Sequence, residues 1–188
     1  KKQQAELNQL IKNVIAEEIR LAKAAEKAEE QPKAENPSAK ALPTTPKVRK
    51  LSASFASNKG NIPWPVDNGF IYKKYGTYPH PTLKGISETN DGIDIQTTNN
   101  APVKSVFPGT VTKITTVPGM GGTIIIKHGE FYTMYSRLKT INVKSGEEVQ
   151  SNTVIGHVYS DDDGYSELHF QTWKGLQVMN PSIWLSSK

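Results

Sequence analysis

The chain contains no cysteine, no long apolar segment and no initiating methionine. Without cysteine there are no disulfides, no thiolate metal sites and no thiol nucleophile. No apolar run approaches the ~20 residues that a membrane-spanning helix needs. Because the chain begins at Lys1, we expect it to be a piece of a longer protein, so that any signal peptide would lie outside this sequence.

The folded part of the chain also lacks an excess of basic residues. The formal net charge is +5, yet residues 1–50 carry 11 Lys and Arg against 7 Asp and Glu, while residues 51–188 carry 12 against 11. A nucleic-acid-binding face concentrates basic residues and interleaves them with aromatic residues, and that pattern is missing. We therefore predict no nucleic-acid partner. With 188 residues, of which 36% are hydrophobic, the chain is long enough for one good core and an appendage.

Residues 1–31 are predicted to form one long helix. From residue 3 to residue 30 there is no Gly or Pro, and Ala, Glu, Lys, Leu and Gln dominate. Apolar residues recur at steps of three and four and form one stripe: Leu7, Leu10, Ile11, Val14, Ile15, Ile19 and Ala22. We interpret this stripe as the end of a coiled coil. The alternative is that the helix folds back over a groove on its own C-terminal domain.

The remaining chain divides into a linker and a β domain. Residues 32–58 are rich in Pro, Ala, Lys and Ser, with prolines spaced along the first part, and predict a flexible linker. Residues 59–188 consist of short β-branched or aromatic stretches separated by Gly, Asn, Asp and Pro. They predict a mainly β, antiparallel domain. Its eight expected strands are 70–75, 92–96, 102–107, 110–116, 123–128, 131–138, 154–159 and 167–173.

Short motifs in the β region resemble those of the LytM or M23 (lysostaphin-type) family, in the family's order. They lie at residues 90–95, 101–103, 108–111, 124–129, 132–138, 143–149, 154–156 and 168–171. A narrower resemblance, to murein hydrolase activators of the EnvC type, rests on residues 60–66 and 179–185 at the two ends of the domain. Those activators also carry a helical coiled coil ahead of the domain. The resemblance therefore implies an antiparallel LytM/M23-type fold behind an N-terminal helix.

The resemblance assigns five positions to the zinc-peptidase machinery, and three of them are replaced. Active members hold zinc with the His and Asp of HxxxD and with the second His of HxH. In this sequence those positions are Asn90, Asp94 and His169, while Glu167 replaces the first His of HxH and Arg137 replaces another histidine. An amide is a poor zinc ligand. A guanidinium stays protonated and repels Zn²⁺. The resemblance thus implies no catalysis, no bound metal and no other cofactor.

One alternative metal site remains open at the level of sequence. It would be rich in carboxylates and would consist of Asp91, Asp94, Glu167 and His169. The competing interpretation is an ion pair between Glu167 and Arg137. The three remaining histidines show no ligand spacing. We interpret His128 as a structural residue at a turn and the other two, His80 and His157, as surface or loop residues.

A groove that has lost zinc can still bind a partner. We predict that its floor is formed by Asn90, Asp94, Tyr132, Tyr135, Arg137, Glu167, His169, Trp173 and Lys174. Tyr, Trp and Arg often dominate protein interfaces, and such a groove suits an amphipathic helix. The resemblance implies that the partner is a zinc-dependent N-acetylmuramoyl-L-alanine amidase, activated during septal peptidoglycan splitting. Activation requires only that the groove bind the open amidase more tightly than the closed one.

The resemblance also implies a setting and further partners. The coiled coil would communicate with a division-associated ABC-transporter complex, the protein would act in the periplasm or envelope of a Gram-negative bacterium, and peptidoglycan would be an additional partner. The N-terminal helix would gate the protein if it occupied the groove. Two other functions stay open: a zinc M23-like endopeptidase with an altered site, and a passive peptidoglycan-binding module.

Overall fold

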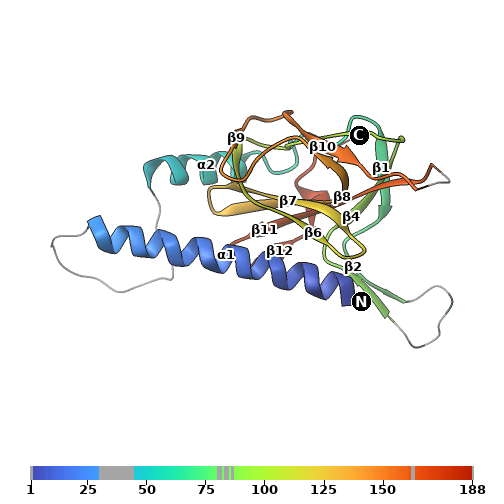
Figure 1. Cartoon of the computed structure of the whole chain (residues 1–188), viewed down its shortest axis with the longest axis horizontal. Coiled ribbons are helices and arrows are strands. Elements are labelled where there is room, and N and C mark those ends of the chain that lie inside the picture. Colours follow the sequence, from blue (N-terminus) through green and yellow to red (C-terminus); the bar gives the residue numbers. More distant parts are fainter. Residues whose placement is uncertain are drawn as a thin grey trace.

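The computed structural model describes residues 2–29, 45–79, 82, 85, 87–161 and 164–187. Within these ranges a β domain is flanked by the helices α1 (Lys2–Glu29) and α2 (Pro46–Ser57), and the short 3₁₀ helix η1 (Pro181–Ile183) lies near the C-terminus (Figure 1). The strands are β1 (Gly69–Lys73), β2 (Gly76–Pro79), β3 (Ser87–Asn90), β4 (Ile93–Thr97), β5 (Pro102–Lys104), β6 (Gly109–Val117), β7 (Gly121–His128), β8 (Phe131–Ile141), β9 (Glu148–Val149), β10 (Val154–Val158), β11 (Ser166–Lys174) and β12 (Gln177–Met179).

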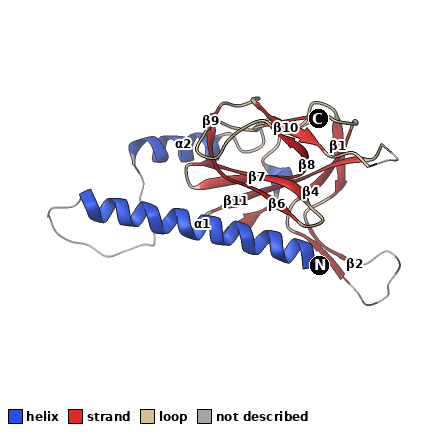
Figure 2. Cartoon of the chain, in the orientation of Figure 1, coloured by secondary structure: helices blue, strands red, loops and turns tan. Residues whose placement is uncertain are grey.

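One antiparallel sheet organises the domain. In the described part of the chain it has ten strands, seven of them in the order β1-β4-β11-β8-β7-β6-β9. β10 joins β8 and β5, and β12 joins β11, while β2 and β3 form a separate hairpin. Strand β8 is central because it pairs with β7, β10 and β11. The predicted mainly β, antiparallel fold is confirmed (Figure 2).

All eight predicted strands are present, with bounds shifted by a few residues. The prediction missed β2, β3, β9 and β12, which have two to four residues each. A segment that short shows little of the two-residue alternation from which strands are recognised.

Helix α2 lies within the segment that we predicted to be a linker, so the linker prediction is wrong for residues 46–57. The helix begins at Pro46, whose fixed φ suits a first helical position, and the side chain of Thr45 accepts a hydrogen bond from Val48 N (3.3 Å). The proline that suggested an extended linker is therefore a helix start. Residues 32–44 of the predicted linker lie outside the described residues.

Phe55 anchors α2 in the main core. Its ring is fully buried and stacks on Phe131 with centroids 4.6 Å apart, and it also contacts the rings of Phe107, His128 and Trp184. The main core fills one side of the sheet and includes residues from β4, β6, β7, β8, β10 and β11. Since aromatic clusters of this kind bury large apolar areas, α2 is an integral part of the domain.

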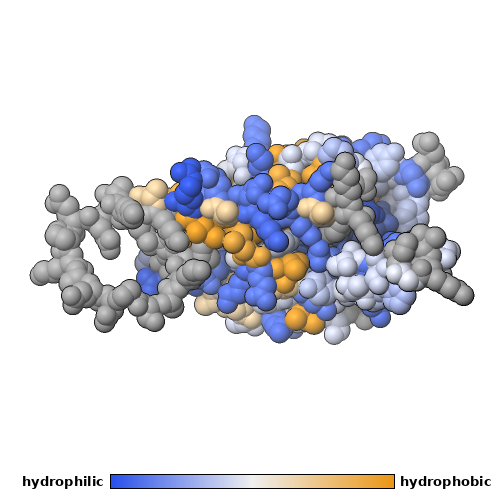
Figure 3. All heavy atoms as spheres, turned by 90° about the horizontal axis from the view of Figure 1, so that it is seen from below, coloured by the Kyte–Doolittle hydropathy of each residue, from blue (hydrophilic) through white to orange (hydrophobic). Residues whose placement is uncertain are grey.

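Helix α1 covers the opposite face of the sheet (Figure 1). Leu7, Ile11 and Ile15, one helical turn apart, are fully buried, and Leu10, Val14 and Ile19 flank them. Beneath them lies a second apolar cluster from the sheet and an adjoining turn: Val117, Met120, Ile125, Tyr132, Met134 and Trp173. Seen from this side, hydrophilic atoms cover much of the face and hydrophobic atoms show between them (Figure 3).

The apolar stripe of α1 therefore packs on the domain's own sheet. This is the fold-back alternative, and in this structure the coiled-coil interpretation is wrong for residues 7–19, because their apolar side chains already have a partner surface. The side chain of Ala22 lies outside the described residues. No helix in the described ranges is both long and apolar enough to span a membrane.

His128 is a buried structural residue, as predicted. Its ring is in the main aromatic cluster, with Nδ1 2.8 Å from the Pro108 carbonyl and Nε2 2.7 Å from Thr133 Oγ1. Burial disfavours the imidazolium and lowers the pKa of His128 from 6.5 to about 4, against a smaller opposing effect of the Pro108 carbonyl.

We predict that His128 contributes to acid lability. The unfolded chain binds a proton at this ring below pH 6.5, whereas the folded chain binds it only near pH 4, so stability is full above pH 6.5 and is lost as the pH falls. The loss should reach about 3 kcal/mol. Urea unfolding between pH 6.5 and about pH 4 should show that His128→Asn loses less of its free energy of unfolding, by that amount, even though this variant is less stable at neutral pH. If the free energy of unfolding fell equally with pH in both proteins, the prediction would be wrong.

Candidate functional site

Five of the predicted groove residues meet on the face of the sheet that α1 covers in part. Asp94 lies on β4 directly across from His169 on β11, and Glu167 precedes His169 by two positions, so both face the same way. Asn90 ends β3 and places its amide 3.4 Å from Asp94 Oδ2. Arg137, on β8, forms an ion pair with Glu167.

A chain of hydrogen bonds fixes His169. Trp173 Nε1 donates to Gln171 Oε1 (2.8 Å), which makes the Gln171 nitrogen the donor to His169 Nε2 (3.0 Å). The proton of the imidazole is then on Nδ1, which lies 2.5 Å from Asp94 Oδ1. Both ring nitrogens are occupied, in a side chain that is 1% exposed.

These residues do not fit the zinc ion that the family implies. Zinc binds the lone pair of a histidine nitrogen, and the one lone pair of His169 accepts a hydrogen bond from Gln171. Asn90 supplies an amide in place of an imidazole, and the Arg137 guanidinium adds a fixed positive charge. The alternative site is not assembled either, since Glu167 pairs with Arg137 and Asp91 accepts from Asn8. Among the described residues, no three His, Cys, Asp or Glu side chains are grouped to hold a metal.

A β-bulge directs Arg137 out of the sheet. Between β7 and β8 the register passes from Ile124↔Tyr135 to Gly122↔Leu138, so β8 contains one extra residue at this point. Arg137 adopts φ +69°, a left-handed conformation that costs a non-glycine residue about 1 kcal/mol. Its backbone is held on both sides, by N–H donation to Met120 O (2.7 Å) and by acceptance from Tyr159 N (2.8 Å). The surrounding structure therefore holds the guanidinium in place.

Charge and burial shift the two acids in opposite directions. Burial alone would raise the pKa of Asp94, but the hydrogen bond from His169 and the electrostatic attraction of the His169 ring and of Arg137 outweigh it and hold that pKa below its usual value. Burial and the charge of Asp94 raise the pKa of Glu167, and Arg137 offsets part of this effect. The site is thus a set of paired charges, with no free base beside an open metal position.

Polar residues of α1 connect the helix to this site. Asn8 Oδ1 accepts from Gln171 Nε2 (3.3 Å), and Asn8 Nδ2 donates to Asp91. Further along the helix, Glu18 forms an ion pair with Lys127 on β7 (2.8 Å). These contacts fix the position of α1 along the sheet, and they join it to the hydrogen-bond chain that ends at Asp94.

Two more predicted groove residues, Tyr132 and Trp173, also lie on this face, but α1 buries both of them. Burial and the nearby charge of Glu18 raise the pKa of Tyr132 well above its usual value. The chain's own helix therefore occupies the part of the predicted floor that contains Tyr132 and Trp173.

The remaining two predicted residues do not lie in the groove. Tyr135 packs against Phe170 in the main core, and its hydroxyl accepts from Val106 N (3.0 Å). The ammonium of Lys174 lies over the Phe131 ring, at 5.5 Å from its centroid, and that ring also belongs to the main core. On a regular strand Tyr135 and Arg137, two residues apart, would share a face, but the bulge between them puts Tyr135 in the main core.

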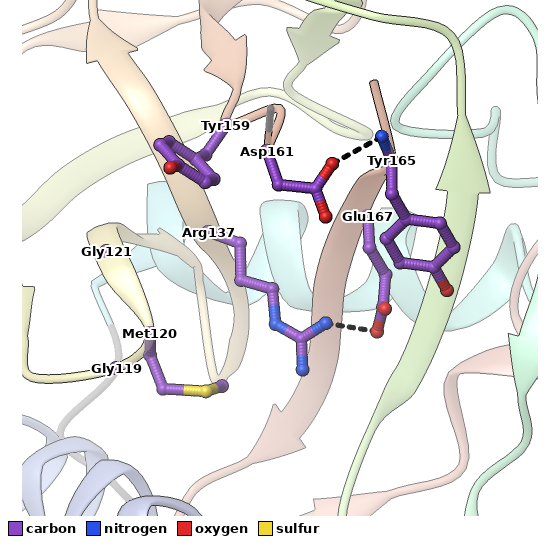
Figure 4. Close-up of a pocket in the computed structure, with 8 residues that line it drawn as sticks. All are labelled: Gly119, Met120, Gly121, Arg137, Tyr159, Asp161, Tyr165 and Glu167. Carbon is purple, nitrogen blue, oxygen red and sulfur yellow. Dashed lines mark hydrogen bonds and ion pairs between the residues drawn. The ribbon is translucent and has the colours of Figure 1, made fainter. Parts of the chain in front are cut away.

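A pocket of about 350 Å³ adjoins the Arg137–Glu167 pair, and sequence reasoning missed most of its lining (Figure 4). Tyr159, Asp161 and Tyr165 form one part of its wall and Met120 another. Their only signal in the sequence is a polar, acidic loop ahead of β11. Gln171 was also missed, although its two-residue spacing from His169 places it on the same face.

The antiparallel sheet, with an Asp–His pair from adjacent strands on one face, defines a LytM/M23-type domain. The sequence profile described as Peptidase family M23 matches residues 88–181, which is half of the chain. The chain belongs to this family.

Three relatives show which proteins the chain is similar to. The chain is 32% identical over 120 residues to the cell division protein DipM of Caulobacter vibrioides, a match that covers 62% of this chain and 18% of DipM. It is 26% identical to a zinc-containing peptidase from Vibrio cholerae, with a TM-score of 0.56 and coverage of 63% and 38%. It is 25% identical to a chain of the SpoIIQ–SpoIIIAH pore-forming complex, with a TM-score of 0.57 and coverage of 68% and 92%.

We predict that the chain retains no stoichiometric zinc after zinc loading and dialysis, as measured by inductively coupled plasma mass spectrometry. The triple variant Asn90→His/Arg137→His/Gln171→Ala restores two family histidines, removes the cation and removes the hydrogen bond that occupies the lone pair of His169, so it should retain about one zinc ion per chain. Asn90→Gln, which keeps a neutral amide, is the matched control and should behave like the unmodified chain. Stoichiometric zinc in the unmodified chain would show that our assessment of the ligands is wrong.

Proposed function

We propose that this chain is a non-catalytic activator of the EnvC type. It binds a zinc-dependent N-acetylmuramoyl-L-alanine amidase through the face that carries Arg137 and His169, and it switches that enzyme on during septal peptidoglycan splitting in a Gram-negative periplasm. The observation that carries the proposal is the state of His169, whose two ring nitrogens are both hydrogen-bonded beside an arginine. A face that no longer suits metal chemistry keeps a shape suited to binding.

The apolar cluster under α1 is the best candidate for the amidase-binding surface. It includes Tyr132, Met134 and Trp173, which are the residue types that adapt to and anchor protein partners. Because α1 itself lies on this surface through residues spaced by four, an amphipathic helix demonstrably fits it. A helix of the amidase would use the same mode of recognition.

In this proposal α1 and the amidase compete for one surface. The amidase then binds only the fraction of molecules in which α1 has left the sheet, and its apparent affinity falls by that fraction. A division-associated ABC-transporter complex that pulls on the segment containing α1 would raise the fraction. Gating would thus follow from the contacts of Ile11 and its neighbours with the sheet.

The relatives are consistent with this role. DipM is a cell division protein, which supports a role in division. The SpoIIQ–SpoIIIAH complex supports the idea that a domain of this fold serves in protein assembly. The main alternative, a zinc endopeptidase, is favoured by family membership and by the zinc-containing Vibrio cholerae relative, but the ligand set of this chain argues against it.

Release of α1 should increase amidase activation. Ile11→Glu places a carboxylate between α1 and the sheet and removes about 1.5–3 kcal/mol of stabilisation from apolar burial. The fraction of molecules in which α1 has left the sheet should therefore rise about tenfold or more. The assay is release of dye from labelled sacculi by the amidase, with activator below saturation. Lys12→Glu, on the exposed side of α1, is the control and should change little. Equal stimulation by both variants would exclude gating by α1.

Arg137 should contribute directly to the interface. Arg137→Ala is expected to reduce amidase stimulation at least tenfold at equal concentration, because interface arginines are frequent hot spots. Lys139→Ala, on the same strand but exposed, serves as control. Circular dichroism should be unchanged in both. Sacculus binding without any amidase stimulation by the unmodified chain would instead support the passive peptidoglycan-binding module.

A further inference from the structure

The pocket beside Arg137 lies at the end of the face that α1 covers, and it remains open. Its lining comes from the turn between β6 and β7, from β8, and from the segment that runs from β10 into β11. The described residues of α1 contribute nothing to that lining. Tyr159 and Tyr165 are 54% and 37% exposed, so both rings are accessible to a ligand from solvent.

We propose that this pocket is a docking subsite for an arginine side chain of the activated protein partner, engaged while α1 is still on the sheet. The inference rests on the proposed function, because the partner is the amidase. It adds a site and a recognition chemistry that the apolar groove under α1 does not supply.

The residues of the pocket suit a guanidinium. Figure 4 shows the rings of Tyr159 and Tyr165 on opposite sides of Asp161, with Arg137 and Glu167 below them. A guanidinium stacks on aromatic faces more readily than an ammonium does, and a carboxylate accepts its planar fork of donors. The pocket thus offers aromatic surface and negative charge together.

The charges favour a cationic ligand. Arg137 and Glu167 neutralise each other as an ion pair, so that among the described residues of the lining the carboxylate of Asp161 is the remaining formal charge. Asp161 Oδ1 accepts the Tyr165 N–H (2.6 Å), and Gly164 N donates to Asp161 O (3.0 Å), so the loop itself holds the carboxylate in place. Tyr72 packs against Tyr165, with ring centroids 6.1 Å apart, and supports the aromatic wall from β1.

The pocket is continuous with the surface under α1. Met120 lines the pocket and also belongs to the apolar cluster that α1 covers. The backbone of Arg137 bonds to Met120 on one side and to Tyr159 on the other. A protein segment anchored in the pocket therefore lies next to the edge of α1. This continuity with the covered groove favours a protein partner over a peptidoglycan fragment.

Docking at a pocket that α1 does not cover changes how the partner reaches the apolar cluster beneath the helix. A partner held at the pocket is present at a high effective concentration when α1 leaves the sheet, so it captures the apolar cluster without a second diffusional encounter. A charged contact made early mainly increases the association rate. Loss of the Asp161 charge should then slow association more than it speeds dissociation.

The first experiment tests the chemistry of the pocket without the amidase. The ¹⁵N-labelled full chain is titrated with N-acetyl-arginine amide and, separately, with the neutral isostere N-acetyl-citrulline amide. Saturable shifts are expected at the amides of Gly119, Gly121 and Tyr165 with the arginine compound alone. Asp161→Asn keeps the oxygen that accepts Tyr165 N–H and should weaken this binding about tenfold. Equal shifts with both compounds, or none at these amides, would overturn the proposal.

Glu147→Gln is the matched control for Asp161→Asn. Glu147 is also an exposed loop carboxylate that accepts a backbone N–H, from Lys144 (2.9 Å), but it lies on the loop before β9. This variant should bind the arginine compound as the unmodified chain does. A loss equal to that of Asp161→Asn would mean that general charge, and not this pocket, attracts the ligand.

The second experiment measures association of the amidase with the immobilised full chain. Asp161→Asn should lower the association rate constant about fivefold to tenfold at low salt, and Glu147→Gln should not. If the unmodified chain binds no amidase, the proposed function fails, whatever the arginine titration shows. If the amidase binds and Asp161→Asn leaves association unchanged, the docking role alone is wrong. Soluble diaminopimelate muropeptides that shift the same amides in an Asp161-dependent way, with amidase association unchanged, would reassign the pocket to peptidoglycan.

Discussion

The hydrogen-bond chain through His169 is the constraint on which the rest of the site depends. Trp173 orients Gln171, Gln171 occupies His169 Nε2, and the remaining proton of the ring is directed to Asp94. With both nitrogens of the ring engaged, the two ligand positions that the family retains in this chain stabilise each other instead of a metal. The arginine and glutamate next to them complete a set of charges that are paired within the chain.

The same chain of contacts explains why α1 is in register with the site. Asn8 accepts from the Gln171 amide that holds His169, so the polar end of the helix joins the former active site to the covering helix. The apolar contacts of Leu7, Ile11 and Ile15 stabilise the packing of α1 on the sheet, but hydrophobic burial does not depend on direction. The polar contacts therefore fix the position of α1 along the sheet. Helix α1 therefore covers part of this face, while the pocket beside Arg137 is left open.

The sequence predicted the strands and the long helix, and the structure brings seven of the nine predicted residues to one face of the sheet, because alternation and ordered motifs report directly on which face a residue occupies. That these residues form a partner-binding groove stays a prediction. The sequence misplaced Tyr135, since nothing in the local pattern reveals the bulge that turns Arg137 outward. It missed α2 because Pro46 has the same appearance in a linker and at a helix start. The sequence did not decide which surface packs against the apolar stripe of the helix, because an amphipathic pattern shows which face of a helix is buried but not what buries it.

The division of the apolar interior into two clusters has a consequence for the energetics of opening. α2 and Phe55 seal the main cluster, whereas α1 alone among the described helices covers the second. Detachment of α1 therefore leaves the aromatic centre around Phe55 intact, and it requires only a subglobal fluctuation whose free energy lies below that of complete unfolding. We therefore expect the domain to unfold in two cooperative units, of which the weaker is α1 with the second apolar cluster.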